Sequence, residues 1–511
     1  MGYFLREMSK PLEVFLLLAS SLLVLELAFY VYIRYILHPR LCQLKKKHQI
    51  VQEPLKQLQR MVTAMKELVK RGVYTPEGFI KGWALGAKSL SDIKKDNLYS
   101  FLSWAFFSKT YDQIKDNKPL MKQLNKIYSF LEASFPTEMA QIEDGCNSEV
   151  THPQMCLTQD FPILHRPLFI YVLVKFMDIC TEWVIMPYMG FKYGRMDMSP
   201  LNPVVDGAAN RLLAEHSDDE GLAEPEQFHI QYWLREKTDS QESPAVYFHG
   251  ITHGWWNYLP AIDRLTPNRT IILVALDNIK MASLNTKTNA PPPKIYANAV
   301  EAIFQRHHIT QQVTIIGHSF GSMTTSWFLK YFPQRVKHVV LIDPVALLLI
   351  LPDVAVNFLY RSPHTTMEWL IYVAAGREVT IAHTMYRNFN WCDNILWLED
   401  LPDHCGCTTL VCGKDDILNG PVVHAYSEHY AAQPTKKGTT RAHIYFPDYA
   451  HADLMWRGQD LAKVDQLIRL GTPFTSSAPT PALVPAPAKE PQLSQPLPVA
   501  VSEIEIAVEV R

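Results

Sequence analysis

The chain opens with an uninterrupted apolar run. Residues Leu12 to Ile33 read LEVFLLLASSLLVLELAFYVYI. A helix of 22 residues is about 33 Å long, which is enough to cross the hydrocarbon core of a bilayer. Glu26 lies inside the run, where a carboxylate is costly, so we expect it to face a partner or to snorkel. A cleaved signal peptide usually has a shorter apolar core. We therefore predict an uncleaved, single-pass membrane anchor with a basic flank over residues 1–45.

Basic residues flank this run unequally. Two precede it, and six follow it: Arg34, Arg40, Lys45, Lys46, Lys47 and Lys56. Lys and Arg collect on the cytoplasmic side of a membrane helix, so the rest of the chain is expected in the cytoplasm. The sequon at Asn268 offers a check, because a glycan there would place the C-terminal part in a lumen and contradict this topology.

Between residues 46 and 200 the apolar positions recur mostly with helical spacing. A second apolar stretch, RPLFIYVLVKFMDICTEWVIMPYMGF, covers residues 166–191. In a helix, Lys175, Asp178 and Glu182 fall on one narrow stripe of this stretch. We interpret the stretch as an interfacial or buried helix. The alternative, a second span, would move everything after it to the other side of the membrane.

After residue 225 short apolar runs alternate with helical segments. The expected strands are QFHIQYWLR, AVYFHG, TIILVALD, VTIIG, HVVLID, TTLVCG and AHIYFP. This rhythm predicts an α/β domain over residues 226–470, with a mostly parallel sheet covered by helices on both faces. A long apolar and aromatic segment at 345–404 predicts a cap inserted between two strands. The Pro- and Ala-rich residues 471–511 predict a disordered tail.

Composition excludes some functions and leaves others open. The net charge of −2 gives no reason to expect a nucleic-acid partner. The eight cysteines are too sparse for a disulfide framework and suit reduced thiols. The run from His404 to Cys407 lacks a second pair at zinc spacing, so no metal site is expected.

One motif carries candidate chemistry. Gly317-His318-Ser319-Phe320-Gly321 fits G-x-S-x-G and stands between an expected strand and an expected helix. Small residues at both ends, Gly317 and Gly321, allow a sharp turn that lifts the serine hydroxyl out of the sheet edge. A serine hydroxyl needs a base, and the base needs an orienting carboxylate. His451 follows the last expected strand and is the natural base for Ser319.

These features resemble the α/β-hydrolase superfamily over roughly residues 226–470. The matching pieces are HGITHGWW, GHSFG, GKDDIL and YAHADL. The resemblance implies that Ser319 is the nucleophile and His451 the base. It also implies an acid three residues after the glycine that ends its strand, which is Asp416. Asp415 and, after HVVLI, Asp343 remain alternatives.

The resemblance further implies an oxyanion hole made of two backbone amides. One is that of Phe320, next to the nucleophile. The other is that of Ile251, after the turn His249-Gly250. His249 and His318 are expected to be turn residues. No cofactor is implied.

Two further segments, FIKGWALGAKSLSDIKKDNLYSFLSWAFF and LIDPVALLLILPDVAVNFLYR, resemble a little-characterised group of membrane-anchored eukaryotic hydrolases. Together these features predict a membrane-anchored serine hydrolase that cleaves carboxylic esters of lipids or other apolar acyl compounds. Membrane lipids and an apolar ester are the expected partners. Acyl transfer by the same residues and a non-catalytic lipid-binding or scaffold role are the alternatives.

Overall fold

A computed structural model gives the fold of the chain. It describes residues 2–43, 51–157, 160–198, 228–281, 283, 290–434 and 439–470. The expected disordered tail at 471–511 lies outside the described residues.

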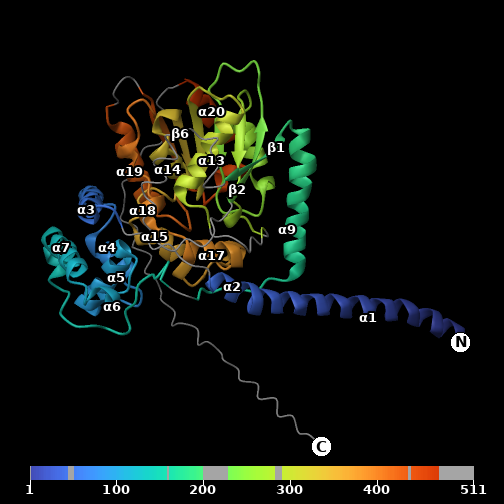
Figure 1. The fold of residues 1–511 in the computed structure, drawn as a ribbon, viewed down its shortest axis with the longest axis horizontal. Helices are drawn as coiled ribbons and strands as arrows, with labels where there is room; N and C mark the ends of the chain where they lie inside the picture. Colours follow the sequence, from blue (N-terminus) through green and yellow to red (C-terminus); the bar gives the residue numbers. More distant parts are fainter. Residues whose placement is uncertain are drawn as a thin grey trace, which may run out of the picture.

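The N-terminal apolar run forms one continuous helix that leaves the body of the molecule (Figure 1). Its parts are α1 (Gly2–Val31), the π-helical η1 (Tyr32–Leu37) and α2 (His38–Gln43). Among the described residues, one helix is long and apolar enough to cross a membrane. It covers Val14–Gln43, and none of its most apolar part is buried. Glu26 has found partners, because its carboxylate accepts hydrogen bonds from the amide of Leu168 at 2.7 Å and from Nε2 of His165 at 2.8 Å.

A helical region follows the N-terminal helix, as expected. Its elements are α3 (Pro54–Lys70), α4 (Pro76–Trp83), η2 (Leu90–Asp92), α5 (Lys95–Phe107), α6 (Tyr111–Ile114), α7 (Lys118–Ser134) and α8 (Pro136–Met139). Thr75 begins α4 by accepting a hydrogen bond from the amide of Gly78 at 3.0 Å, which satisfies one of the free amides of a helix start.

The second apolar stretch is a single helical rod on the side of the body (Figure 1). It consists of α9 (Leu168–Cys180), η3 (Thr181–Ile185) and α10 (Met186–Tyr188). Tyr171, Asp178 and Thr181 are buried against the body, whereas many apolar side chains of the rod are exposed. Because its buried side packs on the body, the rod is a surface helix with one free apolar side.

In the part of the chain that the structure describes, eight strands form one mixed sheet. They are β1 (Lys192–Met198), β2 (Phe228–Arg235), β3 (Ala245–Phe248), β4 (Ile271–Val274), β5 (Val313–His318), β6 (Val336–Ile342), β7 (Gly406–Cys412) and β8 (Arg441–Phe446). Their order is β1-β2-β4-β3-β5-β6-β7-β8. β2 pairs antiparallel with both of its neighbours, β1 and β4. All other neighbouring strands, from β4 to β8 in this order, pair parallel. All seven expected strands are present. The sheet also contains β1, which lies before residue 226 and was not predicted.

Helices cover both faces of the sheet, as predicted. Alternate residues of β3 point to opposite sides, so Val246 and Phe248 join one core and Ala245 and Tyr247 the other. On the first side lie α13 (Pro293–Arg306), α14 (Gly321–Tyr331) and α19 (Gly420–Ala432). On the second lie α12 (Leu259–Leu265) and α20 (Gly458–Leu470).

A helical insertion separates β6 from β7, in the residues predicted to form a cap. Its elements are α15 (Pro352–Ala355), η7 (Val356–Tyr360), α16 (Thr366–Ile371), η8 (Tyr372–Gly376), α17 (Val379–Arg387), α18 (Trp391–Asn394) and η9 (Leu398–Asp400). The insertion is tied to the helical region, because the indole of Trp83 donates to the carbonyl of Ile350 at 3.1 Å and that of Trp391 to the carbonyl of Ala105 at 2.7 Å.

Candidate active site

Ser319 sits on a sharp turn between β5 and α14. Its φ of +52° is unusual for a residue with a side chain. Neither flanking glycine leaves room for a side chain. A Cβ at Gly317 would lie 2.5 Å from Oγ1 of Thr325, and a Cβ at Gly321 would overlap the carbonyl oxygen of Phe248. The predicted role of Gly317 and Gly321 in a tight strand-to-helix turn is therefore what the backbone shows.

His451 lies in the turn after β8 and bonds through both ring nitrogens. Its Nε2 is 2.9 Å from Oγ of Ser319, and its Nδ1 is 2.5 Å from Oδ2 of Asp415. With Nδ1 donating to the carboxylate, Nε2 is free to accept the serine proton. The fold thus brings Ser319 and His451 together across 132 residues, as the sequence predicted.

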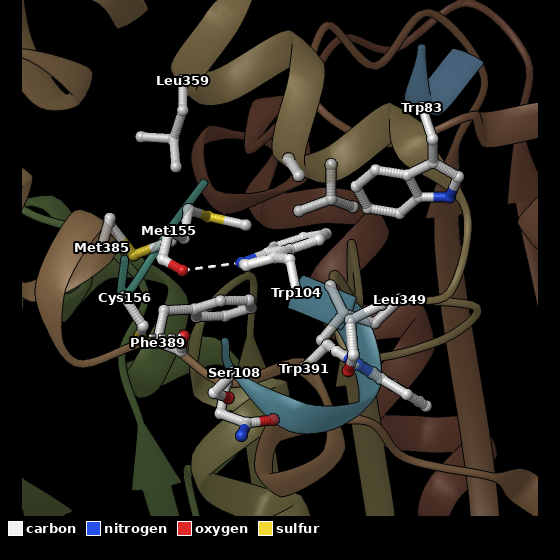
Figure 2. Close-up of a pocket in the computed structure, with 14 residues that line it drawn as sticks. Trp83, Trp104, Ser108, Met155, Cys156, Leu349, Leu359, Met385, Phe389 and Trp391 are labelled. Atoms are coloured by element: carbon white, nitrogen blue, oxygen red, sulfur yellow. Dashed lines mark hydrogen bonds between the residues drawn. The ribbon is translucent and has the colours of Figure 1, made fainter. Parts of the chain in front are cut away.

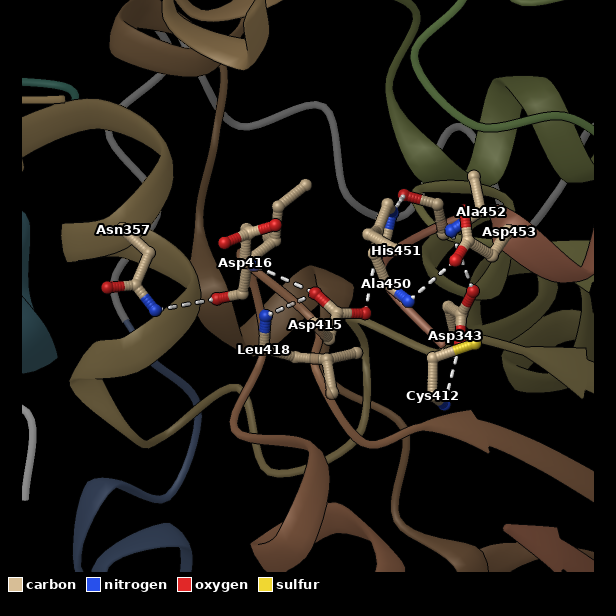
Figure 3. Close-up of polar contacts among 12 residues, drawn as sticks. Asp343, Asn357, Cys412, Asp415, Asp416, Leu418, Ala450, His451, Ala452 and Asp453 are labelled. Carbon is tan, nitrogen blue, oxygen red and sulfur yellow. Dashed lines mark hydrogen bonds and ion pairs between the residues drawn. The ribbon is translucent and has the colours of Figure 1, made fainter. Parts of the chain in front are cut away.

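The acid next to His451 is Asp415 and not the predicted Asp416 (Figure 3). The second carboxylate oxygen of Asp415 accepts hydrogen bonds from the amides of Ile417 at 2.8 Å and Leu418 at 3.0 Å. These bonds close a local turn and fix the carboxylate toward His451. Asp416 instead uses its backbone carbonyl to accept a hydrogen bond from Arg361 at 2.8 Å. The correction moves the acid by one position, to the alternative that the sequence had left open.

Asp343, the third candidate, lies at the end of β6 close to the same histidine (Figure 3). One oxygen accepts from the amide of Cys412 and the other from the amide of Ala452, both at 3.0 Å. Its carboxylate falls within 4.8 Å of the facing atoms of Asp415 and His451. Burial, together with the neighbouring Asp415 charge, raises the pKa of Asp343 to about 6 although His451 opposes this.

Two carboxylates surround one imidazole, and this sets the charge of His451. Burial disfavours the imidazolium, but the charges of Asp415 and Asp343 and the hydrogen bond to Asp415 outweigh it and raise the pKa of His451 to about 9. The site therefore stabilises the protonated histidine that results when Ser319 gives up its proton. The same effect keeps most of the free protein at neutral pH in the protonated form, which cannot accept a proton.

The loop after β3 runs beside Ser319. A Cβ at Gly250 would lie 2.8 Å from the Cβ of Ser319, so only glycine permits this approach. The amide of Gly250 donates to the hydroxyl of Tyr258 at 3.1 Å, and the amide of Thr252 donates to the carbonyl of Ile279 at 3.1 Å. Ile251 is held between these two fixed points. Within the described part of the chain, the amides of Ile251 and Phe320 donate no hydrogen bond, so both suit the predicted oxyanion hole.

His249 lies in the loop that follows β3, as predicted. His318, also expected in a turn, is instead the last residue of β5, and its Nδ1 lies 3.2 Å from the hydroxyl of Tyr258. Nε2 of His249 accepts from the amide of Leu276 at 2.9 Å, so its Nδ1 donates to the carbonyl of Gly250 at 2.7 Å. Burial lowers the pKa of His249 to about 4 and that of His318 well below its usual value. Both rings are therefore neutral, and His451 is the histidine that titrates beside Ser319.

An apolar pocket lies between the helical region and the insertion (Figure 2). It encloses about 550 Å³ of space free of atoms, part of it open to solvent. The helical region contributes Trp83 and Trp104, whose indole donates to the carbonyl of Met155 at 2.7 Å, and the insertion contributes Leu349 and Leu359. Ala346, three residues before Leu349, donates its amide to the hydroxyl of Ser322 in the first turn of α14. The pocket wall is therefore linked to the helix that follows Ser319.

Within the described residues, two groups of three side chains have metal-ligand spacing. One is Asp343, Asp415 and His451, whose imidazole nitrogens are already bonded to Asp415 and Ser319. The other is His38, Cys42 and Asp160 beside the N-terminal helix, where His38 also contacts the carbonyl of Phe161 at 2.9 Å. Neither group has the four-ligand set of a structural zinc site.

Comparison with known families identifies the fold. A family model described as an alpha/beta hydrolase fold matches residues 286–395, which include the turn at Ser319 and most of the insertion. This match and the strand order show that the chain contains an α/β-hydrolase fold. The eight-stranded order, the tight turn at Ser319 after β5 and His451 after β8 all lie in the part of the chain with this fold. No curated protein sequence matches the chain.

Several solved structures match parts of the chain at low similarity. A membrane phospholipase A, described as a bacterial virulence factor, is 13% identical with a TM-score of 0.38, over 59% of this chain and 93% of that chain. Naproxen esterase from Bacillus subtilis is 14% identical with a TM-score of 0.37, over 61% and 100%. A thermophilic esterase from Thermogutta terrifontis is 14% identical with a TM-score of 0.33, over 47% and 93%. The strand order and the family model, and not these superpositions, identify the hydrolase fold.

Proposed function

We propose that this α/β hydrolase is a membrane-anchored serine hydrolase that cleaves carboxylic esters with apolar acyl groups. The observation that carries the proposal is the hydrogen-bonded series from Ser319 to His451 to Asp415, with heavy-atom distances of 2.9 and 2.5 Å. A serine at a strained turn, a histidine within bonding reach and a buried acid behind it are the parts that nucleophilic acyl transfer needs.

In this mechanism Oγ of Ser319 attacks the ester carbonyl while Nε2 of His451 takes the serine proton. Asp415 holds the imidazole in the required tautomer and stabilises its positive charge. His451 then returns the proton to the leaving alcohol, and an acyl-serine remains. Water, deprotonated by the same histidine, releases the acid and restores Ser319.

The negative charge on the carbonyl oxygen is assigned to the amides of Ile251 and Phe320. Backbone amides are rigid donors, so they need no reorganisation when charge develops in the transition state. The close packing of Gly250 on Ser319 supports this role for the next residue, Ile251, because it brings the loop to the nucleophile.

The apolar nature of the substrate is inferred from the surroundings of the insertion. Its pocket with the helical region is lined mainly by Trp, Leu, Met and other apolar side chains, which suit an acyl chain better than a polar group. The exposed apolar helix at the N-terminus supports a setting at a membrane, and the excess of basic residues after it supports a cytoplasmic hydrolase domain.

A panel of esters tests the proposal. The purified full chain should hydrolyse p-nitrophenyl esters and vesicle-borne lipid esters, with a preference for long acyl chains. Ser319→Ala should abolish both activities, and Ser326→Ala, a control serine that bonds to the carbonyl of Ile395, should retain them. Preference for short, water-soluble esters would contradict the apolar substrate. Retained activity in Ser319→Ala would remove the assigned nucleophile.

The topology has its own test. Asn268 is exposed, so it reports the side of the membrane on which the hydrolase domain folds. When the chain is made in the presence of microsomes, Asn268 should stay unglycosylated, whereas a sequon added before the apolar run should be modified. A glycan on Asn268 would reverse the proposed orientation.

A further inference from the structure

The helical rod formed by α9, η3 and α10 turns its acidic side chains inward and an apolar side outward. Its exposed apolar side chains include Phe169, Val172, Leu173, Phe176, Ile179 and Trp183, each between 45% and 65% exposed. Their spacing places them on one face of the helix. Soluble surface helices have the opposite arrangement, and a continuous exposed apolar face marks a binding surface.

The acidic residues of the rod are used inside the protein. Lys280 lies 2.7 Å from the carboxylate of Asp178 and 2.6 Å from that of Glu182. The three side chains are at most 10% exposed. Because these bonds hold the polar stripe against the body, the rod cannot rotate its apolar face inward.

The rod begins at the membrane helix. Glu26 of α1 accepts a hydrogen bond from the amide of Leu168 at the start of α9, and Phe29 packs edge-on against Tyr171 at a centroid distance of 5.2 Å. Figure 1 shows α1 leaving the body at the lower end of α9, while α9 runs along the side of the body across the direction of α1. If α1 crosses a bilayer, the free face of α9 lies along the bilayer surface.

A second exposed apolar group lies close to this junction. Met367, Trp369 and Leu370 of α16 are 40% to 57% exposed. The helix they belong to continues through η8 to Arg377, whose carbonyl accepts a hydrogen bond from the amide of Leu164 at 3.0 Å. Exposed apolar side chains of the insertion are thus tied to the segment that enters α9.

From this arrangement we infer that the outer face of the α9–η3–α10 rod is a lipid-docking surface that lies in the plane of the bilayer crossed by α1. The occupant is the lipid surface itself, because the rod is bonded to the membrane helix and continuous with its exposed apolar side chains. A second copy of the chain or another protein is the competing occupant.

Docking would also fix the active site relative to the lipid. A Cβ at Gly254 would lie 2.8 Å from Oδ1 of Asp178, and the bridge partner of Lys280 is Thr252. The inner side of the rod therefore packs on the loop that carries Ile251. This consequence rests on the proposed function, whereas the docking surface does not.

Photo-crosslinking of the full chain in phosphatidylcholine vesicles tests the surface. Benzoylphenylalanine at position 176 should form adducts with lipid acyl chains, because Phe176 is 63% exposed on the outer face. The matched control is the same amino acid at position 126, an exposed lysine of α7, and α7 is on the opposite side of the body from α9 (Figure 1). Lipid adducts at 176 and none at 126 would support the inference. The absence of lipid adducts at 176, or adducts with a second copy, would overturn it.

A second measurement separates docking from catalysis. Phe176→Glu should lower hydrolysis of vesicle-borne esters and leave hydrolysis of a soluble ester unchanged, since Phe176 lies on the exposed outer face and not on the inner side that packs on the loop of Ile251. Equal loss on both esters, or no loss on either, would count against a docking role. A chain with no esterase activity at all would refute the proposed function and leave the crosslinking result valid.

Discussion

Nδ1 of His451 lies 2.5 Å from Oδ2 of Asp415, while the backbone carbonyl of the neighbouring Asp416 accepts a hydrogen bond from Arg361. Two adjacent carboxylates thus have different roles. The one that faces the histidine is also the one whose second oxygen is fixed by the amides of Ile417 and Leu418. The acid is therefore held on both of its oxygens before substrate binds.

Substitution of each aspartate in turn tests this assignment. Asp415→Asn should lower kcat/KM by about 10³–10⁴-fold, because an amide in place of the acid favours the wrong histidine tautomer. Asp416→Asn is the matched control. Because it removes only a nearby charge, it should lower kcat/KM by less than about tenfold, which corresponds to less than about 1.4 kcal/mol. Ester hydrolysis by both variants provides the comparison. The reverse ranking would restore Asp416 as the acid.

The pH dependence should reflect the two carboxylates beside His451. Only neutral His451 can accept the serine proton, so kcat/KM for an uncharged ester should rise with pH. Since the pKa of His451 is raised to about 9, the acid limb should lie above 6.5, the usual histidine value.

Removal of one carboxylate should shift this limb. Asp343→Asn should move it to lower pH, because Asp343 contributes to the raised pKa of His451. Asp112→Asn, at a side chain that is 81% exposed on α6, should leave the profile unchanged. A limb at or below 6.5 in the unmodified protein would contradict the electrostatic account.

The turn at Ser319 should not tolerate a larger flanking residue. In Gly321→Ala the new Cβ would overlap the carbonyl oxygen of Phe248. Overpacking of this kind lowers the free energy of unfolding by about 1–3 kcal/mol. Gly458→Ala is the control, because the nearest atoms to its Cβ are 3.6 Å away. Thermal unfolding in detergent should show a lower Tm for Gly321→Ala only, and equal Tm values would contradict the close packing.

The buried ion pairs of Lys280 should be important for stability. Lys280→Met would remove the buried cation between Asp178 and Glu182 and leave only the half-exposed Lys175 near Asp178, which costs about 3–5 kcal/mol. Lys192→Met removes the pair with Glu236, whose side chains are 77% and 52% exposed, and should cost about 0–1 kcal/mol. Thermal unfolding of both variants decides the matter. Similar Tm values would mean that the buried pairs are not a net source of stability.

Much of the hydrolase domain could be predicted because local pattern and fold agree. Each expected strand was found, and Ser319 and His451 were predicted from their positions after two of them. β1 is an edge strand, and most of its side chains are not buried. Its sequence, KYGRMDM, therefore has no apolar run, and the strand was not predicted. The acid was misplaced by one residue because the direction of a side chain in a turn depends on backbone angles. The hydrogen bonds from the amides of Ile417 and Leu418 to the Asp415 carboxylate are typical of such a turn. The sequence alone does not show which of the two adjacent aspartates makes them.

The rod formed by α9, η3 and α10 illustrates a different limit. Helical spacing predicted the polar stripe of Lys175, Asp178 and Glu182, but the sequence could not show which side of the helix faces the body. That depends on Lys280, about a hundred residues later in the chain, which pairs with Asp178 and Glu182. Contacts between distant segments decide such orientations, and periodicity alone does not contain them.

The central claim is that Ser319 is a nucleophile activated by His451. Reaction of the full chain with a fluorophosphonate probe measures this directly, because the probe forms a covalent bond with an activated serine. The account predicts labelling of the unmodified protein, none of Ser319→Ala and a strongly reduced rate for His451→Ala, with Ser326→Ala labelled normally. Failure to label the folded, unmodified protein, or labelling that survives Ser319→Ala, would contradict it.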